Sequence, residues 1–301
     1  MPSPPYSRIV LLGNTGYIGS RLAAALQAAA PGVPLVGHSA PSLDLTRQES
    51  SSALEAVLDP DGVLVVCAAI KKQLGDTPEI FQQNLAIVLN ICRAIAARSV
   101  RRVVFFSSAA VYGEDVPHGV IDESTAVEPT SLYGIGKFTA ERLLVRTVAQ
   151  KPGTSLLILR PALVYGPHEP GYYYGPSGFL GKALADSPIT LWGDGEELRE
   201  FLFIDDVVAL TTTLTLGEAA GILNVVSGTS YTYAQALATV AALTGRAPAV
   251  TSRPRTKDKV DHRFDAARIQ EVCPGFRFTP MAEALRRVSS EMAAASPGAR
   301  S

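Results

Sequence analysis

The sequence predicts an α/β fold, in which a doubly wound parallel sheet is accompanied by a smaller C-terminal lobe. Residues 8–12 are a short apolar segment that leads into a glycine-rich turn and then into a segment of helical composition. Residues 63–67 and 103–106 are continuous apolar segments, which are typical of strands buried on both faces of a parallel sheet. Because ligands of such sheets bind at the carboxyl ends of the strands, we expect functional side chains there.

The composition indicates a soluble globular protein. Its 301 residues are 47% apolar, which provides the core of one large domain or two modest ones. The 27 basic and 28 acidic residues balance, so neither nucleic acid nor an anionic membrane surface is an expected partner. The N-terminus lacks the basic and apolar regions of a signal peptide, and no stretch approaches the roughly 18 apolar residues of a membrane span.

The cysteines and histidines predict neither a disulfide nor a metal site. Cys67, Cys92 and Cys273 are scattered and show no CxxC spacing, which predicts free thiols in a reducing cytoplasm. The four histidines and three cysteines form no cluster with metal-ligand spacing, so no metal is expected.

A glycine triplet with the spacing GxxGxxG follows the first strand. Gly13 permits the tight turn, Gly16 lets a pyrophosphate approach the backbone, and Gly19 lets the next helix pack on the strand. The N-terminus of that helix offers N–H donors and its dipole to phosphates. Strand, turn and helix together predict a dinucleotide site. The same site includes the residues between the glycines: Thr15, Tyr17 and Ile18.

The second strand, residues 34–39, bears on the choice between NAD and NADP. An acidic residue is usual at its end when the cofactor is NAD, but His38 and Ser39 stand there. The absence of an acidic side chain removes a charge that would repel the 2′-phosphate of NADP. His38, Ser39 or Arg21 could hydrogen-bond such a phosphate. This favours NADP(H) over NAD(H), although His38 at a simple strand-to-loop turn is the alternative. Asp44 is a candidate acceptor for the adenine amino group, with Leu45 beside it.

Further candidates follow the third and fourth strands. Ala68 and Ala69 let a cofactor lie against the backbone. The fourth strand delivers Ser107 and Ser108 to its carboxyl end. We expect the Ser107 hydroxyl to bond to backbone and the Ser108 hydroxyl to bond to a substrate oxygen. Asn84, on a helix predicted over residues 78–98, is either a surface polar residue or reaches back to the sheet edge.

Tyr133 and Lys137 lie one turn apart on one face of a predicted helix. One unit charge about 4 Å from the phenol, at an effective dielectric constant near 20, supplies about 4 kcal/mol. Lowering the pKa of a phenol from about 10 to about 7 takes about the same free energy. The spacing therefore predicts that Lys137 converts Tyr133 into an acid/base group. The alternative is a half-buried tyrosine beside a solvated lysine.

Five ordered motifs carry a resemblance to a known family. They are GxxGxxG, SSAAVYG, YxxxK, RPALVYGP (160–167) and GDGEELREFLFIDDVV (193–208). In this order they resemble the extended short-chain dehydrogenase/reductase family, specifically its nucleotide-sugar epimerases, dehydratases and ketoreductases. The resemblance implies a Rossmann-type sheet and a catalytic triad of Ser108, Tyr133 and Lys137, with Lys137 also on the nicotinamide ribose. It further implies that Lys71 contacts the cofactor and that Asn84 supports the active site.

The resemblance also divides the chain. Residues 1–163 and 201–227 are expected to form the NAD(P)-binding domain, and residues 164–200 and 228–301 the nucleotide-sugar-binding lobe. Residues 189–206 are predicted to contain a hairpin that ends in a return strand. By resemblance, a homodimer forms through the helices predicted over 78–98 and 132–150. Pro161 is assigned to the cofactor site, and Tyr165 to the substrate site. By resemblance, Arg199 binds the nucleotide diphosphate, and so does Arg255 together with Asp258, three residues further on.

The segment 166–180 contains three consecutive tyrosines. They either stack on a base or line a sugar pocket, or they simply close a loop.

The residues after Ser108 narrow the reaction. The family's 4,6-dehydratases carry an Asp and a Glu there, whereas Ala109 and Ala110 cannot move a proton. A cysteine found near this position in GDP-fucose synthases is also replaced by Ala110. We expect NADPH-dependent reduction of a 4-keto-6-deoxyhexose nucleotide, such as a dTDP-sugar, with Tyr133 as the acid. The alternative is an NAD-dependent 4-epimerase of a UDP-hexose, and a distant alternative is a non-catalytic NAD(P)-binding regulator.

Overall fold

The protein is built around a parallel sheet of six strands. The computed structural model describes residues 6–117, 119–169, 175–256 and 258–294. Its strands run in the order β10-β6-β4-β3-β1-β2, and every neighbouring pair is parallel. This confirms the predicted parallel sheet. The strands are β1 (Ile9–Leu12), β2 (Leu35–His38), β3 (Val63–Val66), β4 (Arg102–Phe106), β6 (Ser155–Pro161) and β10 (Gly221–Val225).

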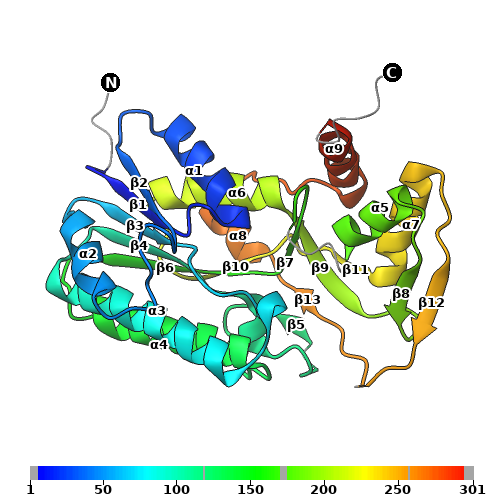
Figure 1. Cartoon of the computed structure of the whole chain (residues 1–301), viewed down its shortest axis with the longest axis horizontal. Coiled ribbons are helices and arrows are strands. Elements are labelled where there is room, and N and C mark those ends of the chain that lie inside the picture. The colour runs from blue at the N-terminus through cyan, green and yellow to red at the C-terminus, as the bar shows by residue number, and fades with distance from the viewer. Residues whose placement is uncertain (1–5, 118, 170–174, 257, 295–301) are drawn as a thin grey trace.

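Helices cover both faces of this sheet (Figure 1). On one face lie α1 (Tyr17–Ala29) and α6 (Ile204–Leu216), with α8 (Ala267–Val272) beside β10; on the other lie α2 (Ser50–Val57), α3 (Pro78–Ala97) and α4 (Leu132–Val148). Alternate side chains of one strand enter different cores. Val104 and Phe106 pack with the first face, whereas Val103 and Phe105 pack with the second. A strand covered on both faces must be apolar throughout, which is why these segments show no polar alternation.

In the residues that the structure describes, the second lobe contains two small sheets and three helices. One sheet has the order β11-β9-β7, and β8 pairs with β12. These strands are β7 (Leu163–Tyr165), β8 (Ile189–Trp192), β9 (Leu198–Phe203), β11 (Ser230–Thr232) and β12 (Val250–Arg253). The helices are α5 (Pro176–Leu184), α7 (Tyr233–Thr244) and α9 (Met281–Ala294). The chain from this lobe returns to the first domain through β13 (Arg263–Phe264), which pairs with β5 (Val120–Ile121).

The predicted hairpin within residues 189–206 is wrong. β8 pairs in parallel with β12, and β9 pairs with β7 and β11. The intervening turn contains Gly193 and Gly195 with φ of +57° and +75°. The local turn residues suggested a hairpin, but the strands find partners remote in sequence. The exact domain bounds stay a prediction, since β9 belongs to the small sheet and α6 directly after it packs on the large one.

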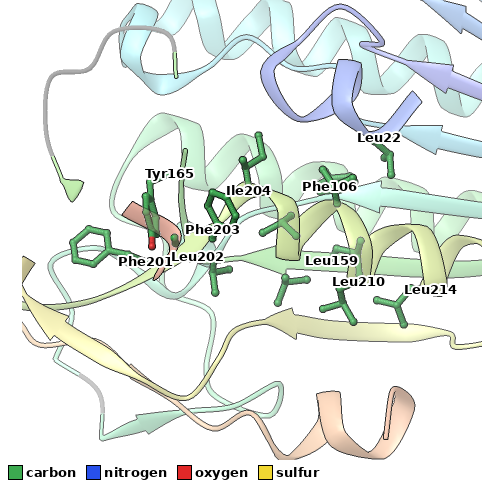
Figure 2. Packing of buried hydrophobic residues seen from close by; sticks show 14 of the residues in the cluster. Leu22, Phe106, Leu159, Tyr165, Phe201, Leu202, Phe203, Ile204, Leu210 and Leu214 are labelled. Carbon is green, nitrogen blue, oxygen red and sulfur yellow. The ribbon is translucent and has the colours of Figure 1, made fainter. Parts of the chain in front are cut away.

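One hydrophobic core runs from the large sheet into the second lobe. Figure 2 shows Phe106 and Leu159 of the large sheet packed in the same cluster as Phe201 and Phe203 of β9. Leu285 of α9 belongs to this cluster as well. A shared, close-packed core has no freedom to slide, so it holds the two lobes in one arrangement around the space between them.

Within the described residues, α3 alone meets the length and composition of a membrane-crossing helix. Ile87, Ile91 and Ile95 of α3 pack in the core on the second face of the sheet.

Candidate active site

A cavity of about 1060 Å³ lies at the carboxyl ends of the large sheet's strands and continues to the second lobe. Its volume slightly exceeds the usual range for a single small-molecule site. Most of the residues predicted for the site line it: Gly13, Thr15, Gly16, Tyr17, Ile18, Gly19, His38, Ser39, Asp44, Leu45, Ala68, Ala69, Lys71, Ser108, Tyr133, Lys137, Pro161, Tyr165 and Arg199. Asn84 and Arg255 are not among its lining residues.

The glycine turn forms a tight cradle between β1 and α1. Gly13 has φ of +86°, and a Cβ there would lie 2.8 Å from the backbone nitrogen of Ala68. A Cβ on Gly19 would lie 2.0 Å from the carbonyl oxygen of Gly13. Gly19 is therefore needed because of the turn itself, rather than the strand as predicted. Gly16 is the N-cap of α1, with neither a side-chain cap nor an acidic residue in the described first turn, which leaves the helix N-terminus suited to an anion.

His38 and Asp44 lie at one end of the cavity, beyond β2. Both ring nitrogens of His38 are buried without a hydrogen-bond partner among the described residues. The Asp44 carboxylate accepts hydrogen bonds from the hydroxyl and backbone nitrogen of Thr46, at 2.6 and 3.0 Å. These bonds hold the pKa of Asp44 below its usual range, so the group is a hydrogen-bond acceptor at neutral pH.

The prediction that Arg21 could hydrogen-bond a 2′-phosphate is wrong, because Arg21 is not among the residues that line the cavity. Its guanidinium pairs with Asp205 of α6 at 2.9 Å and with Glu291 of α9 at 3.2 Å. The side chain therefore links α1 to α6 and α9 and is not available to a 2′-phosphate. The sequence could not show this, because both partners lie more than 180 residues away.

Two asparagines of α3 hold the loops that line the cavity. Asn84 accepts a hydrogen bond from the backbone nitrogen of Ile70 at 2.8 Å and donates to its carbonyl at 3.0 Å. It thus reaches back to the sheet edge, as one alternative had it, and fixes the backbone before Lys71. Asn90 is 1% exposed and donates to the carbonyls of Leu45 and Arg47 at 2.9 and 2.8 Å. Asn90 was not predicted, because its one signal in the sequence is a polar residue within an apolar helix face.

The two serines after β4 have different partners. The Ser107 hydroxyl donates to the buried Glu141 carboxylate, so the predicted backbone bond is wrong. The Ser108 oxygen accepts a hydrogen bond from the backbone nitrogen of Ala110 at 3.1 Å, which caps the short helix η2 (Ala109–Tyr112). The Ser108 side chain also hydrogen-bonds the Tyr133 phenol. Ala109 and Ala110 themselves line the cavity.

The start of α4 fixes Tyr133 against the cavity wall. Asp76 accepts hydrogen bonds from the backbone nitrogens of Tyr133 and Leu132, at 2.8 and 3.3 Å, and Ser131 accepts one from Gly134 at 3.1 Å. A Cβ on Gly134 would lie 2.6 Å from the carbonyl oxygen of Ala110, so only glycine permits this approach of α4 to η2.

The electrostatics of Tyr133 and Lys137 differ from the prediction. Burial raises the pKa of the Tyr133 phenol to about 12, against the opposing hydrogen bond from Ser108. The Lys137 ammonium donates to the carbonyl of Phe106 at 2.7 Å and lies 5.8 Å from the centre of the Tyr133 ring. Burial lowers the pKa of Lys137 to about 8. The expected lowering of the Tyr133 pKa by Lys137 is therefore not found: burial dominates, and Ser108 is the group that opposes it.

Lys71 lies with two other polar side chains at the cavity wall. Its ammonium is 5.3 Å from the centre of the Tyr17 ring, and burial lowers its pKa against the opposing charge of Glu169. Burial raises the pKa of Glu169 to about 7, with Lys71 opposing this. Glu169 was missed because it lies in an irregular Gly- and Pro-rich segment without a pattern.

The two predicted substrate arginines behave differently. Arg199 of β9 lines the cavity, and it donates to the carbonyls of Leu198 and Val260. Arg255 lies outside the cavity, where it pairs with Asp194 at 3.0 Å and Glu197 at 2.7 Å. Asp258 is exposed and does not line the cavity either. The three tyrosines at 172–174 lie outside the described residues.

No group of three or more His, Cys, Asp or Glu side chains in the described part of the chain could hold a metal ion. The three cysteines are free, and burial raises the pKa of the Cys67 thiol to about 12, which keeps it a neutral thiol.

Comparison with known proteins identifies a family. The family model described as "NAD dependent epimerase/dehydratase family" matches residues 9–225. The chain is 32% identical over 158 residues to an uncharacterized UDP-glucose epimerase, YtcB, of Bacillus subtilis, covering 48% of each chain. It is 28% identical to a UDP-glucose 4-epimerase of Mycolicibacterium smegmatis, covering 67% of this chain and 71% of that one. The chain thus spans about half the length of the first of these relatives.

The same architecture is found in a solved epimerase. The structure of the Thermus thermophilus UDP-glucose 4-epimerase in complex with NAD superimposes with a TM-score of 0.82 at 25% sequence identity. The similarity covers 96% of this chain and 100% of that one.

Proposed function

Because this chain belongs to the NAD dependent epimerase/dehydratase family, we propose that it is a nucleotide-sugar oxidoreductase that epimerises a UDP-hexose at C4 with bound NAD. The observation that carries the proposal is the set of Ser108, Tyr133 and Lys137, which line one cavity together with the glycine cradle. The relatives named as UDP-glucose 4-epimerases support epimerisation over the predicted reduction.

The cavity fits a dinucleotide. The glycine cradle admits no Cβ at Gly13 or Gly19, and the N-terminus of α1 lies beside it. His38 has unbonded ring nitrogens at the end of β2, where a dinucleotide ribose binds in such sheets. These residues, with Asp44 at the adenine end and Lys137 at the nicotinamide end, would hold NAD. The complex of the Thermus epimerase with NAD supports NAD over NADP for this chain.

In this proposal Tyr133 moves the proton at the sugar oxygen. Its raised pKa keeps the phenol protonated at neutral pH, which suits the return of a proton to a sugar oxygen. Ser108 hydrogen-bonds the phenol and orients it. Oxidised NAD, when bound, would supply a hydride acceptor and a positive charge beside the phenol. Tyr133 would accept the proton of the sugar hydroxyl and return it in the reverse step, and Lys137 would hold the ribose hydroxyls and add a second positive charge. Ala109 and Ala110 cannot carry out the elimination of a dehydratase.

The test uses the purified protein without added cofactor. Small molecules released from the protein are identified by absorbance and mass. The interconversion of UDP-glucose and UDP-galactose is then followed by NMR. We expect bound NAD, and epimerisation without net consumption of cofactor. Tyr133→Phe keeps the bound NAD and lowers kcat by about 10²–10⁴-fold, the usual contribution of a general acid/base. NAD binding with no turnover of any nucleotide sugar would instead support the non-catalytic regulator.

Reduction of a 4-keto-6-deoxyhexose nucleotide by NADPH is the second candidate. The absence of a carboxylate at the end of β2, where His38 and Ser39 stand, favours it, because nothing there repels a 2′-phosphate. A protein that purifies without cofactor, binds NADPH more tightly than NADH and consumes it with a dTDP-4-keto-6-deoxy sugar would establish this reaction and exclude the epimerase.

A homodimer through α3 and α4 is part of the proposal. The two helices lie side by side on one face of the molecule (Figure 1). Ile135 and Val145 of α4 are each 38% exposed there. Light scattering on the wild type and on Ile135→Glu tests the dimer. The variant should shift toward monomer, and a wild-type monomer at micromolar concentration would exclude it.

A further inference from the structure

A buried charged network lies behind the catalytic residues. Glu141 of α4 and Arg160 of β6 are each 2% exposed and form a two-pronged ion pair. Nε of Arg160 donates to Oε1 of Glu141 at 2.9 Å, and Nη2 donates to Oε2 at 2.6 Å. Nη1 of Arg160 donates to the Tyr112 hydroxyl at 2.9 Å, which in turn donates to Asn224 at 2.8 Å. The network therefore joins α4, η2, β6 and β10.

This network contacts the element that carries each catalytic residue. Tyr133, Lys137 and Glu141 recur every four residues on one face of α4, so each lies one turn from the next. Ser107, which donates to Glu141, directly precedes Ser108. Tyr112 ends η2, the short helix that Ser108 caps.

Stability alone does not account for such a pair. Taking both charges out of water costs several kcal/mol per ion, and replacing a buried pair by apolar residues is often neutral or stabilising. A role in the adjoining site is a reason to place a carboxylate here.

Glu141 is also the carboxylate that acts electrostatically on Lys137, from one turn further along α4. The Lys137 ammonium lies 5.1 Å from the centre of the Phe105 ring and 5.8 Å from that of Tyr133, and its side chain is buried. Of the described residues, the titratable groups that act on it are Cys67 at the end of β3, Tyr133, and Glu141. Cys67 and Tyr133 are neutral at neutral pH, since burial raises the pKa of each to about 12. Glu141 is left as the anion.

We propose that Glu141 is a positioning residue: it is the buried counterion that keeps Lys137 protonated, and it ties the strand end at Ser107 to α4, while Arg160 holds its carboxylate in place. The proposal rests on the function proposed above for Lys137. Without Glu141, burial of Lys137 among aromatic rings would favour the neutral amine, which can neither bind a ribose as an ammonium nor favour a phenolate.

The test follows the protonation of Lys137 directly. The chain has seven lysines, so the ¹³Cε resonances of ¹³C-lysine-labelled protein are few, and Lys137→Arg assigns the one of interest. Two neutral pairs replace the ion pair, Glu141→Gln with Arg160→Met and Glu141→Met with Arg160→Met. Taking the spacing of about 6 Å between Cβ atoms one helical turn apart and an effective dielectric constant near 20, loss of the anion alone lowers the midpoint by about 2 pH units. Loss of the Arg160 cation offsets part of this, so the neutral pairs should lower the midpoint by less than about 2 pH units. Ser107→Ala, which removes a hydrogen bond but no charge, leaves the midpoint in place.

Circular dichroism establishes which variants fold. A folded neutral pair whose Lys137 midpoint stays at the wild-type value would overturn the proposal. If neither pair folds, Glu141→Asp decides the question, because it keeps both charges and withdraws the carboxylate by one methylene group. The midpoint must then fall by a smaller amount, and an unchanged one overturns the proposal. With cofactor and substrate, the alkaline limb of kcat shifts to lower pH by the same amount. Absence of any wild-type turnover would refute the proposed function, while the titration would still test Glu141.

Discussion

Replacing Arg199 and Arg255 separately by alanine tests the shape of the substrate site. The resemblance placed both arginines on a nucleotide diphosphate, but only Arg199 lines the cavity. A hydrogen bond to a charged group contributes about 1.5–3 kcal/mol, so Arg199→Ala should weaken nucleotide-sugar binding by about 10–150-fold. Nη1 of Arg199 donates to the carbonyls of Leu198 and Val260, and Nη2 lies 3.8 Å from a carboxylate oxygen of Glu197. A phosphate would use the donors of Nε and Nη2, in competition with Glu197.

Arg255→Ala is the matched control. Arg255 pairs with Asp194, which is 69% exposed, and with Glu197. The pair with Asp194 is screened by solvent and contributes about 0–1 kcal/mol to stability, whereas Glu197 is only 20% exposed. None of the three side chains lines the cavity, so the variant should unfold more easily and bind substrate as the wild type does. Isothermal titration with UDP, the nucleotide part of the proposed substrate, measures both affinities. Equal losses in the two variants would show that Arg255 reaches the ligand, and that the cavity described here is not the whole substrate site.

Three further predictions concern the rest of the molecule. Asp76→Ala removes the hydrogen-bond acceptor at the start of α4, so it should lower the free energy of unfolding by about 0.5–2 kcal/mol and lower kcat more than it raises KM. Asp76→Ser should retain most of the stability and most of the activity. Urea unfolding and steady-state kinetics measure both, and wild-type values for the alanine variant would contradict the prediction. Gly19→Ala places a Cβ 2.0 Å from the carbonyl oxygen of Gly13, so it should abolish NAD binding. The control is Gly32→Ala, whose Cβ meets nothing within 4 Å and which should bind NAD normally. If calorimetry shows that Gly19→Ala binds NAD with wild-type affinity, the glycine turn is not the NAD site. Burial raises the pKa of Glu200 to about 7, so its protonated state stabilises the fold fully below about pH 4.5, and that contribution is lost as the pH rises through 7. Glu200→Gln should therefore raise the free energy of unfolding at pH 8 by on the order of 3 kcal/mol relative to the wild type. Its free energy of unfolding should also depend less on pH between 5 and 8. Parallel profiles of stability against pH for the two proteins would count against the prediction.

Much of the fold could be predicted because its signals are local. A strand covered on both faces is apolar at every position, and the six-stranded sheet contains such strands at the places where the sequence has apolar runs. The glycine turn could be located for the same reason, since Gly13 needs a positive φ that its own position dictates. The pairing of β8 with β12 could not be predicted, because nothing within residues 189–206 encodes a partner some 60 residues away.

The site shows the same limit. Residue type and spacing located Ser108, Tyr133 and Lys137 on one wall of the cavity. They did not separate Arg199 from Arg255 or Arg21, since an arginine looks the same in sequence whether it lines the cavity or pairs with carboxylates outside it. Asn90 and Glu141 escaped notice because each acts through partners from other elements, and a buried polar residue has no local pattern of its own.

The electrostatics of Tyr133 show why a spacing cannot replace coordinates. An ammonium about 4 Å from a solvated phenol would lower the pKa of that phenol, and the spacing of Tyr133 and Lys137 alone predicts such a pair. In the structure Lys137 turns its ammonium toward the carbonyl of Phe106, and the ring centre of Tyr133 is 5.8 Å away. Burial then acts on both groups in opposite directions, raising the pKa of Tyr133 to about 12 and lowering that of Lys137 to about 8. Burial favours the neutral form of both side chains, so a fixed anion near Lys137 is needed to keep its ammonium protonated. In our proposal Glu141 is that anion. It follows that the pH at which the site loses its positive charge depends on a residue that does not line the cavity.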